Sequence, residues 1–515
     1  MSRVANPVLP GCYPDPSVCR VGGDYYLVTS TFEYFPGLPV FHSTDLARWE
    51  HIGDVVTRSD QLDYSQIASS GGLYAPTLRY HDGRYWVVCT LVDPADATRG
   101  GNFLMTATDP AGPWSDPVWL DADGIDPSIF FDDDGRVWMH GTRLAREPRW
   151  HDQTEVWVRE FDPTTMALVG PETVVWNGAM LGVVWAEAPH LYKVDGRYYL
   201  LAAEGGTEFH HSVAVARAES VTGPYESNRC NPVLTHRHLG RDSDVVGAGH
   251  ADLVQAADGS WWALLLAMRP YGGYHYPLGR ETFLVPVTWE DGWPVFAPGE
   301  GRVPAEVEVP FAAAAPAGDA GGVVRPEDPR WTSLRGPAAA FATARGDGWT
   351  LRPSVETLTD PGTPSFLGLR QQHRDLDVSA TLRAPLAAGE EAGLAIRQSE
   401  RDHVRLALAA DPSGDAVVRA VHRRAGEETL LGEARPGVAV GSPLTLDVHA
   451  RGADYDLGVT TVDGARTVVA TADARTLDSV ATGGFIGLWL GVYATTPDPA
   501  SATVVEVDRV EYRPA

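Results

Sequence analysis

The sequence is poor in cysteine and contains no long apolar segment. Its four cysteines, Cys12, Cys19, Cys89 and Cys230, are too few for a disulfide framework and follow no metal-binding spacing, so we predict free thiols. No stretch approaches the roughly 18 apolar residues that a membrane-spanning helix needs. Residues 1–10 lack the charged and apolar regions of a secretory signal. We therefore expect a cytoplasmic protein without a membrane partner.

Positive charge is scarce as well. Lys193 is the single lysine, and 68 acidic residues against 41 basic ones give a formal net charge of −27. Because nucleic acids are bound through clustered Lys and Arg, the charge argues against a nucleic-acid partner. It also disfavours anionic membranes and polyanionic substrates, so a neutral ligand fits better.

Helical periodicity is missing too, and a hairpin pattern recurs in its place. Each of five copies has a short strand, a tight turn and an aromatic-rich strand, which together indicate a β-hairpin. The copies start 51 to 63 residues apart, enough for a four-stranded sheet with its loops. They read DPSVCRVGGDYYLVTS from Asp15, APTLRYHDGRYWVVCT from Ala75, DPSIFFDDDGRVWMHGT from Asp126, APHLYKVDGRYYLLAAEGG from Ala188 and ADLVQAADGSWWALLLAMRP from Ala251.

Repeated four-stranded sheets that pack radially form a β-propeller. We predict an all-β fold, a five-bladed β-propeller followed by a β-sandwich domain. A single β-sandwich with fortuitous internal similarity is the alternative.

The composition changes after residue 300. Residues 301–325 are rich in Ala, Pro and Gly and predict a linker. Residues 1–300 would then be the propeller and catalytic domain, and residues 326–515 a β-sandwich accessory domain. Its strand-like runs alternate apolar and polar residues, as in LDVSATLRAP, AGLAIRQS, VRLALAA, LTLDVHA and GGFIGLWLGVY.

Aligning the repeats brings ionisable residues to one axial position. Asp15 and Asp126 occupy the first position of their repeats, and Glu187 and His250 directly precede theirs. Because the inner strands of a propeller converge on one funnel, these side chains should meet there. Glycoside hydrolysis needs two carboxyl groups, a proton donor and a base or nucleophile, and a third can raise the donor's pKa. A metal site or an ion-pair network is the competing interpretation of three acids in a funnel.

Several ordered motifs resemble glycoside hydrolase family 43. They cover residues 6 to about 295 and read NPVLPGCYPDPSVCRVGGDYYLVTSTFEYFPGLPVFHSTDL, SGGLYAPTLRYHDGRYW, GIDPSIFFDDDG, AEAPHLYKVDGRYYLLAAEGGTEFHHS, GHADLV and LGRETFL. WTSLRGP, SFLGLRQQH and GLWLGVYA resemble the β-sandwich of its β-xylosidase and α-L-arabinofuranosidase branch. The resemblance implies that Asp15 is the general base, Glu187 the general acid, and Asp126 the carboxylate that raises the pKa of the acid and positions it.

The same resemblance implies the rest of the site. Arg280 would bind sugar hydroxyls in the −1 pocket, with an ion pair to Glu281 as the alternative. Phe32 and Tyr74 would form the pocket walls, or else ordinary core, and many relatives carry Trp where Tyr74 stands. The predicted substrate-binding set is Arg280, Phe32, Tyr74, Ile125 and Thr207. His250 would point, often through water, at a structural Ca²⁺ ion on the propeller axis, or else be a hydrogen-bonded histidine of the funnel floor.

We therefore expect an exo-acting, inverting glycoside hydrolase that releases terminal xylose, arabinofuranose or both from neutral oligosaccharides derived from xylan or arabinan. Its chemistry would need no cofactor, and the sequence leaves a homo-oligomer open. The sandwich is either a separate glycan-binding module or a domain that packs on the funnel; we favour the second, which an aromatic such as Tyr493 projecting into the funnel would support. The alternatives are a retaining fructan-type glycosidase, whose WMNDPN-type opening is absent, and a non-catalytic carbohydrate-binding propeller.

Overall fold

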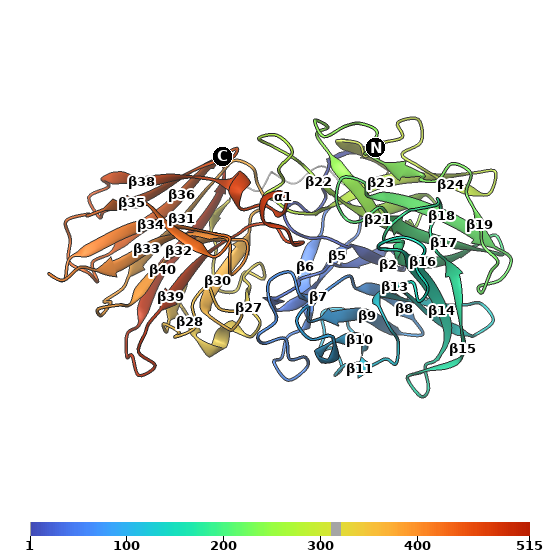
Figure 1. The fold of residues 1–515 in the computed structure, drawn as a ribbon, viewed down its shortest axis with the longest axis horizontal. Helices are drawn as coiled ribbons and strands as arrows, with labels where there is room; N and C mark the ends of the chain where they lie inside the picture. The colour runs from blue at the N-terminus through green and yellow to red at the C-terminus, as the bar shows by residue number, and fades with distance from the viewer. Residues whose placement is uncertain (1, 311–320) are drawn as a thin grey trace.

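The computed structural model describes residues 2–310 and 321–515. Between residues 17 and 296, all of them described, the chain folds into five antiparallel sheets of consecutive strands (Figure 1). The first contains β2 (Ser17–Val21), β3 (Asp24–Val28), β5 (Gly37–Ser43) and β6 (Glu50–Val56). The second contains β7 (Gly72–Leu73), β8 (Thr77–His81), β9 (Arg84–Val92), β10 (Gly101–Ala107) and β11 (Val118–Trp119).

The next three sheets follow the same plan. The third contains β12 (Ile125–Phe131), β13 (Val137–Leu144), β14 (Thr154–Asp162) and β15 (Ala167–Trp176). The fourth contains β16 (Glu187–Val194), β17 (Arg197–Glu204), β18 (Ser212–Ala218), β19 (Glu226–Ser227) and β20 (Leu234–Thr235). The fifth contains β21 (Val246–Gln255), β22 (Trp261–Met268), β23 (Glu281–Glu290) and β24 (Trp293–Phe296). The five predicted hairpins are confirmed as β2–β3, β8–β9, β12–β13, β16–β17 and β21–β22.

The sheets close into a ring. β2 contacts β8, β8 contacts β12, β12 contacts β16, β16 contacts β21, and β21 contacts β2. Each neighbouring pair of sheets shares a buried apolar cluster, and Leu27 and Leu264 belong to the one between the first and fifth sheets. Side chains alternate between the two faces of a strand, so one strand packs against both neighbouring sheets. In β17, Tyr198 packs toward the third sheet and Tyr199 toward the fifth. The ring brings together β2, β8, β12, β16 and β21, the strands that open the five predicted hairpins.

A local backbone feature directs side chains to the start of these strands. Asp15, Asp126, Ala188 and His250 have positive φ angles of 57°, 53°, 50° and 48°. The pairing register shifts next to the last three of these residues. Such bulges re-aim side chains. In the fifth repeat the residue with positive φ is His250. The alignment of the sequence repeats places the next residue, Ala251, at this position instead.

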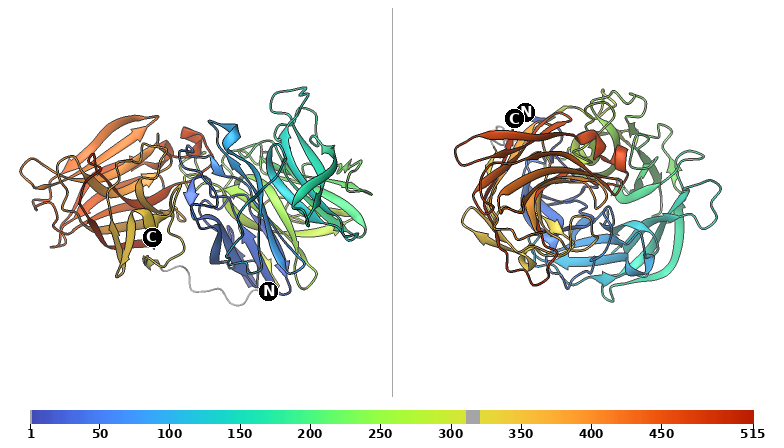
Figure 2. Two further views of the ribbon diagram at one scale, coloured as in Figure 1. Left: turned by 90° about the horizontal axis from the view of Figure 1, so that it is seen from below. Right: turned by 60° about the vertical axis from the view of Figure 1, so that its left-hand side comes forward.

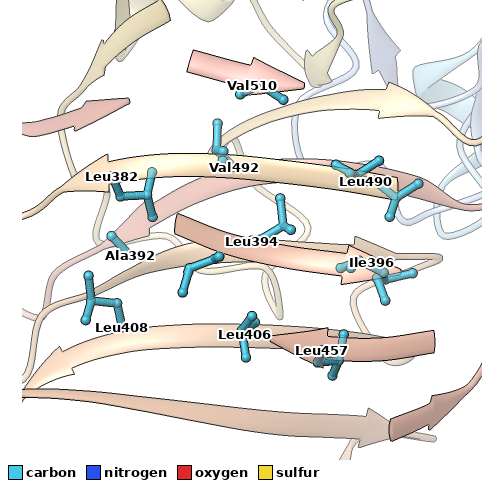
Figure 3. Close-up of a cluster of buried hydrophobic side chains, with 14 of the residues drawn as sticks. Leu382, Ala392, Leu394, Ile396, Leu406, Leu408, Leu457, Leu490, Val492 and Val510 are labelled. Atoms are coloured by element: carbon cyan, nitrogen blue, oxygen red, sulfur yellow. The ribbon is translucent and has the colours of Figure 1, made fainter. Parts of the chain in front are cut away.

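The C-terminal part forms the predicted β-sandwich, which Figure 2 shows beside the ring of sheets. Its larger sheet contains β26 (Gly322–Val323), β28 (Ala342–Arg345), β29 (Gly348–Leu351), β31 (Leu376–Arg383), β36 (Leu444–Arg451), β37 (Asp454–Thr460), β38 (Arg466–Asp473) and β40 (Val505–Pro514). The smaller contains β30 (Ser365–Arg370), β32 (Glu391–Arg397), β33 (His403–Ala410), β34 (Ala416–Arg424), β35 (Glu427–Ala434) and β39 (Trp489–Thr495). Their inner faces share an aliphatic core that includes Leu382, Leu394, Leu406 and Val492 (Figure 3).

Short elements join the two halves. Inside the predicted linker, β25 (Glu306–Val309) pairs with β1 (Ser2–Ala5), and β26 pairs with β40, while residues 311–320 lie outside the described residues. β4 (Tyr34–Phe35) pairs with β27 (Ser333–Leu334), which links the first sheet directly to the C-terminal half.

Helix is confined to short turns in the described residues, in line with the predicted all-β class. They are η1 (Ala97–Arg99), η2 (Ala338–Ala340), η3 (Ala474–Thr476) and α1 (Ser479–Thr482). No described helix is both long and apolar enough to cross a membrane. All four cysteines are free thiols, as predicted.

Candidate active site

The three predicted acids come together from three different sheets. Asp15 precedes β2, Asp126 lies at the start of β12, and Glu187 begins β16. Asp15 and Asp126 are buried, Glu187 is partly buried, and the charges of Asp15 and Asp126 both act on Glu187. Asp126 is fixed by the N–H of Ala188, which donates to its Oδ2 at 3.0 Å. The ring thus gathers the carboxyl groups that the sequence repeat predicted to meet.

Asp15 is held in its ionised form. Arg280 Nη1 donates to its Oδ1 at 2.9 Å, and Ser30 Oγ donates to its Oδ2 at 2.5 Å. Burial opposes ionisation, but Arg280, with His250 and the Ser30 hydroxyl, lowers the pKa of Asp15 below its ordinary value. The group is therefore a carboxylate at neutral pH, as a base that activates water must be.

The pKa values of the other two acids, Glu187 and Asp126, are raised instead of lowered. Burial, followed by the negative charges of Asp126 and Asp15, raises the pKa of Glu187 well above its ordinary value. Burial and the charge of Asp15 raise the pKa of Asp126 to about 7. Glu187 can therefore keep a proton at neutral pH beside an ionised Asp15. Two carboxyl groups with divergent pKa values are the arrangement that acid–base hydrolysis of a glycosidic bond requires.

Arg280 lies between the acids and the aromatic wall. It is buried, and its Nη1 also donates to Thr207 Oγ1 at 3.0 Å. Its guanidinium carbon is 5.5 Å from the ring centroid of Phe32. Arg280 makes no ion pair with Glu281, whose carboxylate instead accepts from Arg269 at 2.7 Å. The alternative interpretation of Arg280, a surface ion pair, therefore does not describe this residue.

Phe32 and Tyr74 form one aromatic group with a residue that the sequence did not single out. Their ring centroids are 5.6 Å apart, and Phe485 lies 6.2 Å from Phe32 and 5.9 Å from Tyr74. The Phe485 carbonyl accepts from Arg280 Nε at 3.2 Å. Phe485 comes from the C-terminal domain, so both halves of the chain contribute to this aromatic group. Ile125, half-buried, directly precedes Asp126 in β12.

The expectation for Tyr493 was wrong. Its hydroxyl contacts Glu391, and the ring lines a cavity of about 510 Å³ in the sandwich together with Arg405 and His403. The run GGFIGLWLGVY is also not one strand, because β39 begins only at Trp489. The preceding Gly483 and Gly484, both with positive φ, form a turn that presents Phe485. A Gly–Gly pair before an aromatic is the one signal in the sequence that pointed to this loop.

The residues near His250 do not fit a calcium site. His250 Nδ1 lies 3.4 Å from Asp15 Oδ1, and burial lowers the pKa of the imidazole. Behind it, Arg79 donates to both oxygens of buried Asp252, at 2.8 and 3.1 Å. The guanidinium also lies 3.1 Å from Nδ1 of His190, whose ring centroid is 6.4 Å from that of His250, so positive charge is already present in this neighbourhood. In the described part of the chain, no group of three or more His, Cys, Asp or Glu side chains is arranged to hold a metal ion.

Comparisons with known proteins agree with this geometry. Residues 4–294 match the family described as glycosyl hydrolases family 43, and residues 326–513 match the beta xylosidase C-terminal concanavalin A-like domain. The chain is 44% identical to a xylosidase/arabinosidase of Butyrivibrio fibrisolvens over 78% of its own length and 79% of that protein's. It is 37% identical to a non-reducing end alpha-L-arabinofuranosidase of Bacteroides ovatus, covering 99% and 94%. Among solved structures, xylan beta-1,4-xylosidase from Bacillus halodurans superposes with a TM-score of 0.92 at 32% identity, covering 99% and 100%.

Proposed function

Because the chain belongs to glycoside hydrolase family 43, we propose that it is an exo-acting, inverting enzyme that releases terminal xylose or arabinofuranose from neutral oligosaccharides. We also propose that its five sheets are the blades of a propeller, with residues 1–300 as the catalytic domain and 326–515 as the accessory sandwich. The meeting of Asp15, Asp126 and Glu187 from three different sheets, with Arg280 bonded to Asp15, is the observation that carries this proposal, and the opposite pKa shifts of Asp15 and Glu187 agree with it.

The proposed reaction takes one displacement. The Asp15 carboxylate accepts a proton from water as the water oxygen bonds to the anomeric carbon. The bond from that carbon to the leaving oxygen breaks, and Glu187 gives its proton to that oxygen. Asp126 keeps Glu187 protonated before the step, and Arg280 binds the sugar hydroxyls and keeps Asp15 ionised. Proton exchange with solvent restores both acids.

The aromatic residues beside the proposed sugar site support an exo-acting enzyme. Phe485 reaches the pocket from the C-terminal domain and lies beside Phe32 and Tyr74. A pocket closed by a second domain favours the end of a chain over its middle. The curated relatives include both a xylosidase/arabinosidase and an arabinofuranosidase, which supports a pentose at the −1 position.

The proposal is tested with 4-nitrophenyl β-D-xylopyranoside and α-L-arabinofuranoside side by side. We expect turnover of at least one substrate, and NMR of the first-formed sugar should show inversion. Asp15→Ala and Glu187→Ala should each lose about 10²–10⁴-fold in kcat while the chain remains folded, although Asp15→Ala should also lower the melting temperature because it leaves buried Arg280 without its carboxylate. A retained configuration would favour the fructan-type mechanism, and binding of pentosides without turnover would favour a carbohydrate-binding propeller.

A further inference from the structure

Ser70 lies behind the aromatic walls of the pocket and bonds to two of them. Its carbonyl accepts the Tyr74 hydroxyl at 2.9 Å, and its Oγ accepts the Phe485 N–H at 2.9 Å. Ser70 is buried and has a φ angle of +67°, a conformation that a non-glycine residue keeps only when its surroundings enforce it. One serine therefore connects a wall residue of the catalytic domain with a wall residue of the sandwich.

A buried ion pair between the two domains holds Ser70 in place. The Ser70 N–H donates to Glu33 Oε2 at 3.1 Å, and Arg397 Nη1 donates to Glu33 Oε1 at 3.1 Å. Both charged side chains are fully buried. Glu33 also directly follows Phe32, the third wall residue. The carboxylate thus bonds to the serine on one side and to β32 of the sandwich on the other.

The ion pair belongs to a charge-balanced group. Arg397 Nη2 donates to Ser69 Oγ at 2.8 Å and to Glu400 Oε1 at 3.1 Å, and Arg335 bonds the same Glu400 oxygen. Two arginines therefore neutralise two glutamates, Glu33 and Glu400. Pairs of this kind contribute little net stability compared with apolar packing, but they fix geometry, because each partner is costly to leave alone. The group is suited to orienting the loop that carries Ser69 and Ser70.

We propose that Ser70 is a positioning residue that transmits docking of the C-terminal domain, through the Glu33–Arg397 pair, to Tyr74 and Phe485. The pocket walls then take their working positions only when the two domains are packed together. This inference rests on the proposed function for its meaning in catalysis, but the positioning itself is measurable without any turnover. Ser70 does not contact the acids, so it acts on substrate binding and leaves acid–base chemistry unchanged.

Ser70→Ala tests the inference in the full chain, because it removes only the hydroxyl and keeps the backbone. Ser333→Ala is the matched control. Ser333 is also buried at the junction of the two halves, and its Oγ contacts Gly336 O at 2.6 Å and Phe35 O at 3.4 Å but no wall residue. We expect hydrogen–deuterium exchange of the Phe485 amide to accelerate about five- to tenfold in Ser70→Ala and to stay unchanged in Ser333→Ala.

Kinetics supply the second readout. KM for the 4-nitrophenyl pentosides should rise about three- to tenfold in Ser70→Ala, with kcat and both limbs of the pH profile unchanged. If Ser70 acts through Phe485, then Ser70→Ala should add little to the KM of Phe485→Ala. The inference would be overturned if Ser70→Ala had the same amide exchange rate and KM as Ser333→Ala. It would also be overturned if the effects of Ser70→Ala and Phe485→Ala on KM were fully additive. A wild-type chain that turns over neither pentoside would refute the proposed function, whereas the exchange result would still decide the role of Ser70.

Discussion

At the scale of single residues, the site depends on similar groups in unequal surroundings. Asp15 and Glu187 are both carboxylic acids in one pocket. Burial opposes the ionisation of both, but Arg280, His250 and the Ser30 hydroxyl outweigh it at Asp15, whereas the charges of Asp126 and Asp15 add to it at Glu187. The surroundings thus separate the proposed base from the proposed acid.

Asp126→Asn should shift the alkaline limb of the pH profile. The charge of Asp126 helps to raise the pKa of Glu187, so removing it lowers that pKa, and the general acid loses its proton at a lower pH. We expect the alkaline limb of kcat/KM to move to lower pH, and kcat to fall on the order of 10²-fold. The measurement is kcat/KM against pH for Asp126→Asn, for the control variant described next and for the wild type.

Asp132→Asn is the control for this experiment. Asp132 lies at the far end of the same hairpin and bonds Lys193 and Tyr198, not the acids. The acid and alkaline limbs of the kcat/KM profile of Asp132→Asn should match those of the wild type. An alkaline limb that stays in place in Asp126→Asn, or moves equally in both variants, would remove Asp126 from the role of modulator.

At the scale of elements, the loop before β39 carries Phe485 and so sets where this ring lies relative to Phe32 and Tyr74. Gly484 has a φ of +81°, and a Cβ there would lie 2.4 Å from Ser70 Oγ. Gly483 has a φ of +78° and nothing within 4 Å of such a Cβ. Both adjacent glycines have a positive φ that L side chains rarely adopt, but only at Gly484 would an added side chain press against the catalytic domain.

Gly484→Ala and Gly483→Ala form a matched pair that separates strain from contact. Both variants should lose about 1–3 kcal/mol of stability, because a residue with a side chain adopts a positive φ only at a cost. Gly484→Ala should in addition push Phe485 away from Phe32 and Tyr74 and raise KM for the pentosides about tenfold. Measured KM and melting temperature distinguish the two effects. Equal KM values in the two variants would show that the contact with Ser70 does not set the pocket.

This loop also shows where prediction from the sequence stops. The hairpins were predictable because a turn and its flanking strands are local in the chain. The three acids followed from the repeat, since equivalent positions in a ring must meet. Phe485 and Ser70 lie 415 positions apart and meet only through the packing of two domains. The fifth repeat was begun one residue late, at Ala251 instead of His250, because a bulge adds a residue that the repeat pattern does not show.

At the scale of the whole molecule, one buried network ties the sheets together at the axis. Asp252 in β21 accepts from Arg79 of β8, Ser17 of β2 and Tyr192 of β16. Arg79 also bonds His190, whose Nδ1 lies 3.2 Å from Ser128 Oγ of β12. One strand from every sheet, namely β2, β8, β12, β16 and β21, therefore contributes to it. An arginine at this place makes a bound cation unnecessary for charge balance.

Chelation should accordingly leave the protein unchanged. Because Arg79 already neutralises Asp252, we expect treatment with excess EDTA to alter neither the melting temperature nor pentoside turnover. Both are measured before and after treatment, with added CaCl₂ as the reverse test. A lowered melting temperature that CaCl₂ restores would mean that the chain holds a cation despite its donor set.

Asp252→Asn should loosen the whole ring, with a pH dependence that identifies the charge. Burial opposes ionisation, but Arg79 and the hydrogen bonds hold the pKa of Asp252 below its ordinary value. The stabilisation is therefore complete above the unfolded-state pKa and is lost as pH falls toward the lowered folded-state value. Stranding Arg79 should cost about 3–5 kcal/mol at neutral pH. By calorimetry, the wild-type advantage in melting temperature should stay constant from pH 7 to about 5 and shrink only in stronger acid. An advantage that already declines between pH 7 and about 5 would assign the stabilisation to another group, because an Asp with a lowered pKa stays ionised throughout that interval.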